Sequence, residues 1–396
     1  MYRLWKSTMS YLRRVFVVLA TFSCLFFISA CTATEGGAGE SEPLLEGAAE
    51  QSGPGQPTGL QAKTLLTWLR EPWGMDFLPD GRLLLTEKEG VLKIVTPADW
   101  STVDVGGLPE VFSEGQGGLL DVLVHPDFSD NGLIYLSYSI ALDGGSTTRV
   151  ARARLAGEQL EGLEVLFTAL PAYNERRHYG SRLLLDDGYL YITVGDRGNR
   201  KLAQDLSTHN GKVMRLTESG GTPEDNPFVG QAGARQEIYS YGHRNPQGIA
   251  KNPVTGAIWV AEHGPQGGDE INILKAGANY GWPVITYGEE YGGGKIGEGT
   301  HKEGLEQPLV YYTPSLGVGG IDFYVGDHYP QWQPSLLVSG LRLKRLNRLE
   351  LDGEGVGRET RLLGNSDMRI RDVQVGPDGL IYLLADRSRL IRVEID

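Results

Sequence analysis

One hydrophobic pattern recurs six times along the chain. Each copy is a turn built from Pro, Asp, Asn or Gly, followed directly by a short run of leucine, β-branched and aromatic residues. The copies are LPDGRLLLTE from Leu78, HPDFSDNGLIYLSYS from His125, LDDGYLYITVGD from Leu185, NPVTGAIWVAEHG from Asn252, YPQWQPSLLVSG from Tyr329 and GPDGLIYLLAD from Gly376. Runs of this length and composition predict buried β-strands.

The spacing of the copies predicts the architecture. The predicted strands begin roughly 45 to 78 residues apart, close to the length that four strands and their turns need for one blade of a β-propeller. Long stretches with helical periodicity are missing from the sequence, and a β-sandwich would not repeat one strand motif at this interval. We therefore expect an all-β, six-bladed β-propeller over residues 61–396, with the strand aromatics Tyr135, Tyr191, Trp259 and Tyr382 packed between blades.

The first sixty residues do not follow the repeat. Within the first thirty, four basic residues and no acidic one accompany an apolar run from Val15 to Ile28, the layout of a signal peptide and too short for a permanent membrane span. The sequence ISAC that follows resembles a bacterial lipobox, which implies that Cys31 becomes the lipidated first residue. An ordinary cleaved signal peptide is the alternative.

These features predict three segments. Residues 1–30 are a lipoprotein signal peptide. Residues 31–60, rich in Gly, Glu, Ala, Ser and Pro, are a lipidated disordered tether, and residues 61–396 are the folded domain. The expected location is extracytoplasmic, on the periplasmic or cell-surface side of a bacterial membrane, which holds the protein through Cys31.

The charge of the chain excludes one class of partner. The formal net charge is −13, and loss of the four positive charges of the leader makes it −17 (−13 minus 4). So acidic a protein is repelled by the phosphates of nucleic acid. Of the two cysteines, Cys24 leaves with the leader, so the mature chain has no internal disulfide to form.

Polar clusters occur just outside the repeated strands, where the loops of a propeller meet its axis. His178 precedes a predicted strand pair whose far end carries Asp196. Histidine near a carboxylate is the usual composition of a general base, although a loop histidine is more often structural. In GHRNPQG, Arg244 and Asn245 supply many donors, either for an anionic or multi-carbonyl ligand or for their own loop.

Two further clusters indicate a metal and an anion. The segment AEHGPQGGDEINILK places Asp269 and Glu270 beside glycines and a proline with open carbonyl groups. Such hard oxygens favour calcium over zinc, although surface acids are more often mere turn residues. Basic residues, among them Arg342, gather in LRLKR and MRIRD of an otherwise acidic protein. Arg369 and Arg371 alternate along a short strand and so point the same way, which favours an anionic ligand over solvated charge.

At these clusters the sequence resembles the soluble quinoprotein glucose and aldose sugar dehydrogenases, which use pyrroloquinoline quinone (PQQ). The similarity runs from about Trp68 to the C-terminus and includes, in one order, GQGGLLDVLVHPDF, HYGSR, VGDRG, GHRNPQG, GPQGGDEIN, GANYGWP and RIRDVQVGPDG. The resemblance implies an oxidoreductase, dependent on PQQ and Ca²⁺, that oxidises aldose sugars at C1 to lactones. It does not identify the electron acceptor.

The resemblance also implies roles for single residues. His178 takes the proton of the sugar C1 hydroxyl, and Asp196 orients it. The residues that bind PQQ are Gln116, Arg244, Asn245, Tyr291, Arg342, Arg369 and Arg371. The backbone carbonyls of Gly264 and Pro265 bind the calcium beside PQQ, and Glu270 with the Tyr280 carbonyl binds a structural calcium.

The chain departs from the pattern of the glucose enzyme at three positions. Arg342 replaces a lysine, Arg177 replaces an acidic residue before the base, and His263 replaces a glutamine beside the calcium loop. The loops around residues 199–210 and 285–335 are shorter as well. These differences favour the broader aldose sugar branch.

Two other functions are compatible with the same fold. A calcium-dependent lactonase requires a calcium cage at the axis and has no need of Arg369 and Arg371. A cofactor-free binding propeller is expected to have lost His178 or Arg244, and both are present.

Overall fold

The computed structural model describes residues 59–353, 355–363 and 368–395. The predicted signal peptide, Cys31 and nearly all of the predicted tether lie outside the described residues, so the expectations about export, lipidation and membrane attachment stay predictions. Within the described part of the chain, no helix combines the length and the hydropathy that crossing a membrane requires.

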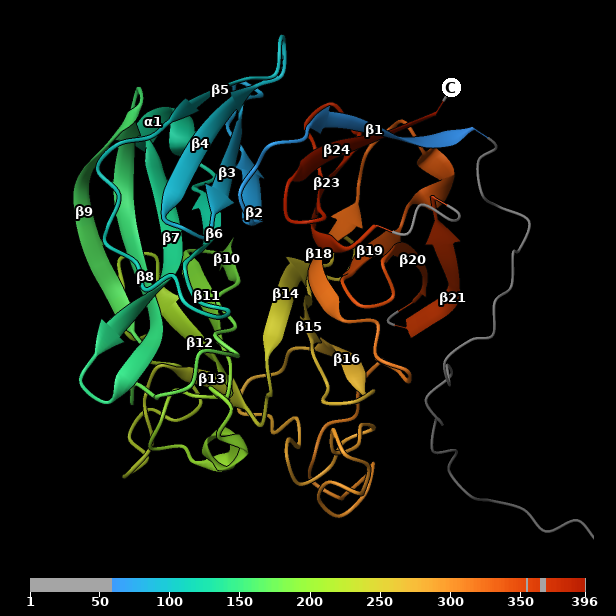
Figure 1. The fold of residues 1–396 in the computed structure, drawn as a ribbon. Coiled ribbons are helices and arrows are strands. Elements are labelled where there is room, and N and C mark those ends of the chain that lie inside the picture. Colours follow the sequence, from blue (N-terminus) through green and yellow to red (C-terminus); the bar gives the residue numbers. More distant parts are fainter. Residues whose placement is uncertain (1–58, 354, 364–367, 396) are drawn as a thin grey trace, which may run out of the picture. The chain divides into compact units, whose positions relative to one another are not determined.

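Six four-stranded antiparallel sheets form the fold, which confirms the predicted six-bladed β-propeller (Figure 1). Blades 1 to 3 consist of β2 (Pro72–Phe77), β3 (Leu83–Glu87), β4 (Val91–Thr96) and β5 (Ser101–Asp104); β6 (Leu119–Val124), β7 (Leu133–Leu142), β8 (Gly145–Ala156) and β9 (Gln159–Thr168); and β10 (Leu183–Asp186), β11 (Tyr189–Val194), β12 (Lys212–Thr217) and β13 (Ile238–Tyr241). Blades 4 to 6 consist of β14 (Pro246–Lys251), β15 (Ile258–Glu262), β16 (Asp269–Ile273) and β17 (Val310–Tyr312); β18 (Val318–Tyr324), β19 (Ser335–Gly340), β20 (Arg345–Asp352) and β21 (Gly355–Leu362); and β22 (Ile370–Val375), β23 (Ile381–Ala385), β24 (Arg389–Ile395) and β1 (Leu60–Leu66).

The ring is closed by the two ends of the folded domain. β1 pairs antiparallel with β24, with Ala62 opposite Val393, so the first strand completes the last blade. Figure 1 shows this as the blue β1 alongside the red β24. The first strands of neighbouring blades contact one another all the way round, from β2 through β6, β10, β14, β18 and β22 back to β2, which places them around the central axis.

The six sequence repeats are the turn between the first two strands of each blade together with the second strand, namely β3, β7, β11, β15, β19 and β23. In four of these turns an Asp or Asn side chain accepts a hydrogen bond from a backbone N–H two residues later: Asp80, Asn131, Asn252 and Asp378. Gly81 and Gly379 of the two PDG turns have φ of 85° and 74°, values that glycine adopts without strain.

The hydrophobic core lies between the blades. Each of the six interfaces between neighbouring blades contains its own cluster of buried apolar side chains. The second strands are covered on both faces, and every residue of β3, β19 and β23 is buried, which is why they read as continuous hydrophobic runs. The predicted interblade packing of Tyr135, Tyr191, Trp259 and Tyr382 is confirmed.

Within the described ranges, three short helices lie in the connecting loops. They are α1 (Phe128–Asn131) and the 3₁₀ helices η1 (Arg200–Gln204) and η2 (Pro330–Trp332). Only η1 bears on the site described below, because Gln204 at its end donates a hydrogen bond of 2.8 Å to the carbonyl of Trp282.

Candidate active site

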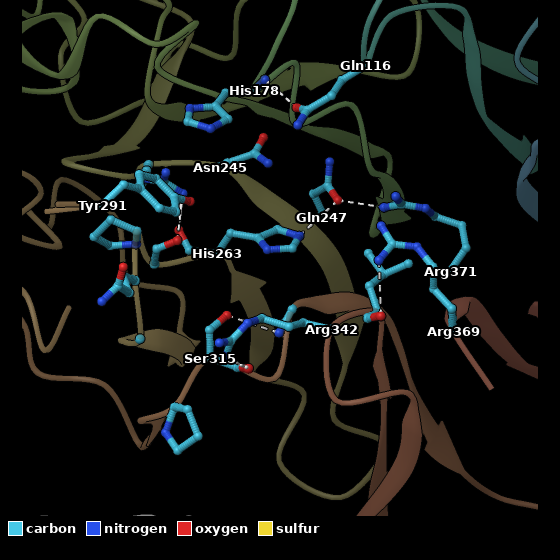
Figure 2. A pocket seen from close by; sticks show the side chains of 18 of the residues that line it. Gln116, His178, Asn245, Gln247, His263, Tyr291, Ser315, Arg342, Arg369 and Arg371 are labelled. Carbon is cyan, nitrogen blue, oxygen red and sulfur yellow. Dashed lines mark hydrogen bonds between the residues drawn. The ribbon is translucent and has the colours of Figure 1, made fainter. Parts of the chain in front are cut away.

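A cavity of about 890 Å³ opens at the end of the propeller where the first strands begin. All six blades contribute to it, through residues that precede or open their first strands, and several turns after second strands complete the wall. Figure 2 shows side chains that line this cavity. The wall includes most of the residues predicted from sequence: Gln116, His178, Arg244, Asn245, Gly264, Pro265, Tyr291, Arg342, Arg369 and Arg371.

His178 and Asp196 form a hydrogen-bonded pair at the edge of this cavity. His178 Nδ1 lies 2.7 Å from Asp196 Oδ1, and Asp196 is buried behind the ring. The antiparallel pairing of β10 with β11 brings them together, because His178 precedes β10 and Asp196 follows β11. A carboxylate only accepts hydrogen bonds, so Asp196 keeps the proton on Nδ1 and leaves the lone pair of Nε2 available.

The electrostatic surroundings keep the imidazole of His178 neutral. Burial lowers the pKa of His178 below its ordinary 6.5, and the charge of Arg244 acts in the same direction against the opposing hydrogen bond to Asp196. Burial opposes ionisation of Asp196, but the hydrogen bond from His178 and the charge of Arg244 outweigh it, so the pKa of Asp196 is lowered. The pair is therefore a neutral imidazole with a carboxylate, the state that a general base requires.

The backbone of His178 is held in an unusual conformation. Its φ is 57°, in the left-handed region that non-glycine residues rarely adopt. The side-chain oxygen of Gln116 accepts a 2.7 Å hydrogen bond from the N–H of His178, and that of Asn245 accepts one of 3.1 Å from Gly180. Two residues predicted to bind the quinone thus also fix the loop that carries the predicted base.

Trp282 is a member of this group that the sequence analysis missed. Its indole N–H donates a 2.8 Å hydrogen bond to Asp196 Oδ2, the carboxylate oxygen not used by His178. The guanidinium groups of Arg244 and Arg200 lie 5.4 and 5.5 Å from the centre of its ring system. The motif GANYGWP drew attention to the segment, but nothing in the sequence connects it to Asp196.

Replacing Trp282 with phenylalanine is expected to lower kcat by about 10-fold, because a charge-assisted hydrogen bond contributes roughly 1.5–3 kcal/mol and only part of it affects the transition state. Steady-state kinetics of W282F tests this. W259F is the matched control: Trp259 is equally buried, but its N–H has no hydrogen-bond partner among the described residues. Equal losses of kcat in the two variants would contradict a specific role of the Trp282–Asp196 bond.

Across the cavity stand several guanidinium groups. Arg369 Nη1 donates to the carbonyl of Leu341 at 3.1 Å, and Arg371 Nη1 donates to Gln247 Oε1 at 2.7 Å. Neither has a carboxylate partner among the described residues, and Figure 2 shows both on the side opposite His178. Unpaired cations that line one wall of a cavity provide a site for an anion.

The positive charge of Arg371 is strongly destabilised by its surroundings. Burial lowers the pKa of Arg371 to about 9, and the neighbouring charges of Arg182 and Arg369 contribute to the shift. Gln247 Oε1 also lies 3.1 Å from His263 Nε2, and burial together with Arg371 lowers the pKa of His263 well below 6.5. The floor of the cavity is therefore a positively charged surface in which a bound anion would relieve repulsion.

Tyr291 and Arg342 lie at the mouth of the cavity. Tyr291 is 69 % exposed. Arg342 is exposed as well, and its Nη1 donates a 3.1 Å hydrogen bond to the carbonyl of Ser315. Both residues are placed where they can cover a ligand that has entered, rather than where they hold its buried end.

The loop from Gly264 to Gly268 gathers backbone carbonyl groups, the kind of ligand that the predicted calcium ion requires. A Cβ at Gly264 would lie 2.2 Å from the carbonyl oxygens of Gly267 and Gly268, so only glycine permits this tight turn. The N–H of Gly264 donates to Asp269 Oδ1 at 2.9 Å, which anchors the loop from below. Gathered backbone carbonyls are ligands that calcium prefers, and the Gly264 carbonyl, which accepts from Arg244 at 2.7 Å, keeps a second lone pair.

Glu270 and Tyr280 lie outside the cavity wall, consistent with a separate structural role. Glu270 faces Glu262 across β15 and β16, and burial together with this neighbour raises the pKa of Glu270 well above its ordinary value. Asn272 donates to both carboxylates at 3.2 Å, while its own side-chain oxygen has no partner within the described part of the chain. Two repelling carboxylates fit a cation.

The described residues contain no cluster of three or more His, Cys, Asp or Glu side chains that could hold a metal. Calcium at either place would therefore depend on backbone and amide oxygens as well as carboxylates. The two calcium sites and the PQQ contacts remain predictions, supported by the chemistry of the donors.

A buried histidine–carboxylate pair on one side of a cavity and a wall of guanidinium groups on the other form an arrangement typical of an enzyme site, here on a six-bladed propeller. The family model described as Glucose / Sorbosone dehydrogenase matches residues 69–392. The chain belongs to this family, and the resemblance noted in the sequence is thereby confirmed.

Individual relatives agree with this assignment. The chain is 42 % identical over 339 residues to the aldose sugar dehydrogenase YliI of Escherichia coli, a match that covers 84 % of this chain and 91 % of that protein. A crystal structure of a glucose dehydrogenase superimposes with a TM-score of 0.83 at 44 % identity, covering 85 % of this chain and all of the other. The PQQ-bound aldose sugar dehydrogenase of Streptomyces coelicolor superimposes with a TM-score of 0.70 at 28 % identity, covering 86 % and 100 %.

Proposed function

We propose that this protein oxidises aldose sugars at C1 to lactones with PQQ as the oxidant and Ca²⁺ as its companion ion. The observation that carries the proposal is that His178, paired with Asp196, and the guanidinium groups of Arg369 and Arg371 line the same cavity. The relatives named for aldose sugars, and the PQQ-bound structure among them, support the choice of substrate class and cofactor.

The charges of the cavity match such a cofactor. PQQ is planar and carries three carboxylates, and Arg342, Arg369, Arg371 and Arg244 would hold it with Gln116, Asn245 and Tyr291. The carbonyls of Gly264 and Pro265 would hold the calcium. When bound, PQQ would accept the hydrogen and electron pair of sugar C1. Calcium would stabilise the negative charge that the acceptor gains.

The protein itself supplies the base. His178 Nε2 takes the proton of the C1 hydroxyl, so that the O–H bond breaks and an N–H bond forms. Asp196 Oδ1 stabilises the resulting imidazolium through the proton on Nδ1, and Trp282 and the N–H of Gly198 hold the carboxylate in place at 2.8 and 2.7 Å. Because these groups are buried and fixed before the sugar arrives, little reorganisation accompanies the transfer.

The proposal is tested by reconstitution. Purified protein is treated with a chelator, then supplied with PQQ, Ca²⁺ or both, and reduction of a redox dye is followed with a panel of aldoses. We expect activity only with both additions. The same samples are assayed for calcium-dependent hydrolysis of lactones without PQQ. Dye reduction without PQQ, or lactone hydrolysis alone, would overturn the proposal.

The low pKa of His178 predicts the pH dependence. A base must be unprotonated, so kcat/KM should fall as the pH drops through the pKa of His178, which lies below 6.5 in the free protein. Above that value the rate should form a plateau up to at least pH 8. Measurement of kcat/KM between pH 4.5 and pH 9, at a constant and saturating PQQ concentration, tests this; a limb centred above pH 7 would contradict it.

A further inference from the structure

Arg197 is buried beside the catalytic pair but has no role in the function proposed above. Its side chain is fully inaccessible to solvent. The guanidinium donates to the backbone carbonyls of Glu175 and Arg177 and, at 3.0 Å, to the hydroxyl of Ser146. Two of these acceptors belong to the loop that carries His178.

The same guanidinium also contacts the residue that follows His178. It stacks on the ring of Tyr179 at 3.5 Å, and the hydroxyl of Tyr179 shares a 2.6 Å hydrogen bond with Ser146. Arg197 thus holds the loop on both sides of His178, through Arg177 before it and Tyr179 after it.

The charge of Arg197 is poorly compensated. Its acceptors are carbonyls and a hydroxyl, and its Nε has no partner among the described residues. Burial lowers its pKa even though the negative charges of Asp196 and Glu175 oppose the shift. By contrast Arg182, equally buried, pairs with Asp121 at 2.9 Å and Asp372 at 2.7 Å. A buried cation without a carboxylate partner costs stability, and such a cost is retained where geometry matters.

We propose that Arg197 is a positioning residue that locks the left-handed backbone of His178, so that the imidazole meets Asp196 and presents Nε2 to the cavity. Within the segment VGDRG, Asp196 then orients the ring of the base while the next residue fixes its main chain. The inference rests on the proposed role of His178 as the base.

Three variants test it. R197M removes all donors with little change in length, and R197K keeps the charge but cannot bridge two carbonyls and cover a ring. R215M is the matched control from the same blade: Arg215 on β12 is also buried, stacks on Tyr189 at 4.6 Å and donates to Asn226 at 2.8 Å, away from His178.

The first measurement uses protein without cofactor. The seven histidines are labelled with ¹³C at Cε1, and the signal of His178 is identified by its loss in H178Q. We expect the titration midpoint of His178 to rise toward 6.5 in R197M, because a loosened loop admits water, and to stay unchanged in R215M. The second measurement is steady-state kinetics of the reconstituted enzyme, where we expect R197M to lower kcat by about 10- to 100-fold with KM for the sugar changed less than about threefold.

The outcomes are separable. A folded R197M with the wild-type titration and kcat overturns the inference, and so does an R215M that changes both readings as much. If R197M does not fold, R197K decides by the same two readings, with a partial loss of kcat expected. If the wild-type protein shows no PQQ-dependent oxidation, the proposed function fails, while the titration still reports whether Arg197 positions His178.

Discussion

Replacing His178 with glutamine lowers kcat by about 10²–10⁴-fold, the usual contribution of a general base, and leaves PQQ binding nearly unchanged. We expect catalysis and PQQ binding to be affected separately because His178 contacts the predicted quinone-binding residues through its backbone: its N–H donates a hydrogen bond to Gln116. Glutamine at position 178 retains that N–H. Dye-reduction kinetics and a PQQ titration of the same preparation measure the two effects independently.

The chain offers a matched control for this variant. His125 is also buried and lies 3.2 Å from a carboxylate oxygen of Glu218, but it belongs to a turn between first and second strands, at the opposite end of the propeller. H125Q should affect stability and leave kcat within about twofold of wild type, since its pair does not reach the cavity. An H178Q enzyme as active as H125Q would refute the assignment of the base.

Replacing Arg371 with methionine is expected to weaken PQQ binding by about 100-fold or more and, without PQQ, to leave the melting temperature unchanged or raise it. Loss of one partner of a buried charge pair costs roughly 2–5 kcal/mol of affinity. In the free protein the same guanidinium is disfavoured by burial and repelled by Arg182 and Arg369, so its removal relieves strain. Fluorescence titration and thermal unfolding measure the two quantities.

The opposite signs distinguish a ligand-binding cation from a structural one. R348M serves as the control, because Arg348 is buried near Trp332 at 5.3 Å but pairs with Glu350, within its own blade. We expect R348M to lower the melting temperature and to leave the affinity for PQQ unchanged. If R371M destabilised the free protein as R348M does and bound PQQ normally, the anion site would have to lie elsewhere.

The architecture was predictable because its determinants are local. A turn such as PDG and the buried run that follows it need no distant partner to be recognised, and both occur once in every blade. The closure of the ring was not predicted: the strand that completes blade 6 is β1, and its pairing with β24 depends on the whole circle being formed. The proximity of His178 and Asp196 was likewise accessible from the sequence. His178 precedes β10 and Asp196 follows β11, so both lie at the open end of one local hairpin.

The sequence by itself determined the repeat, the blade count and the polar residues gathered at the loops, because each is encoded within a few tens of residues. Only the tertiary structure decided which of them meet. Trp282 reaches Asp196 across 86 residues, and Arg371 reaches Gln247 across 124, because the six first strands converge on one axis. Burial at that axis also lowers the pKa of His178 and of Arg371. Desolvation depends on everything packed around a group and not on its neighbours in the chain, so the sequence alone does not give these shifts.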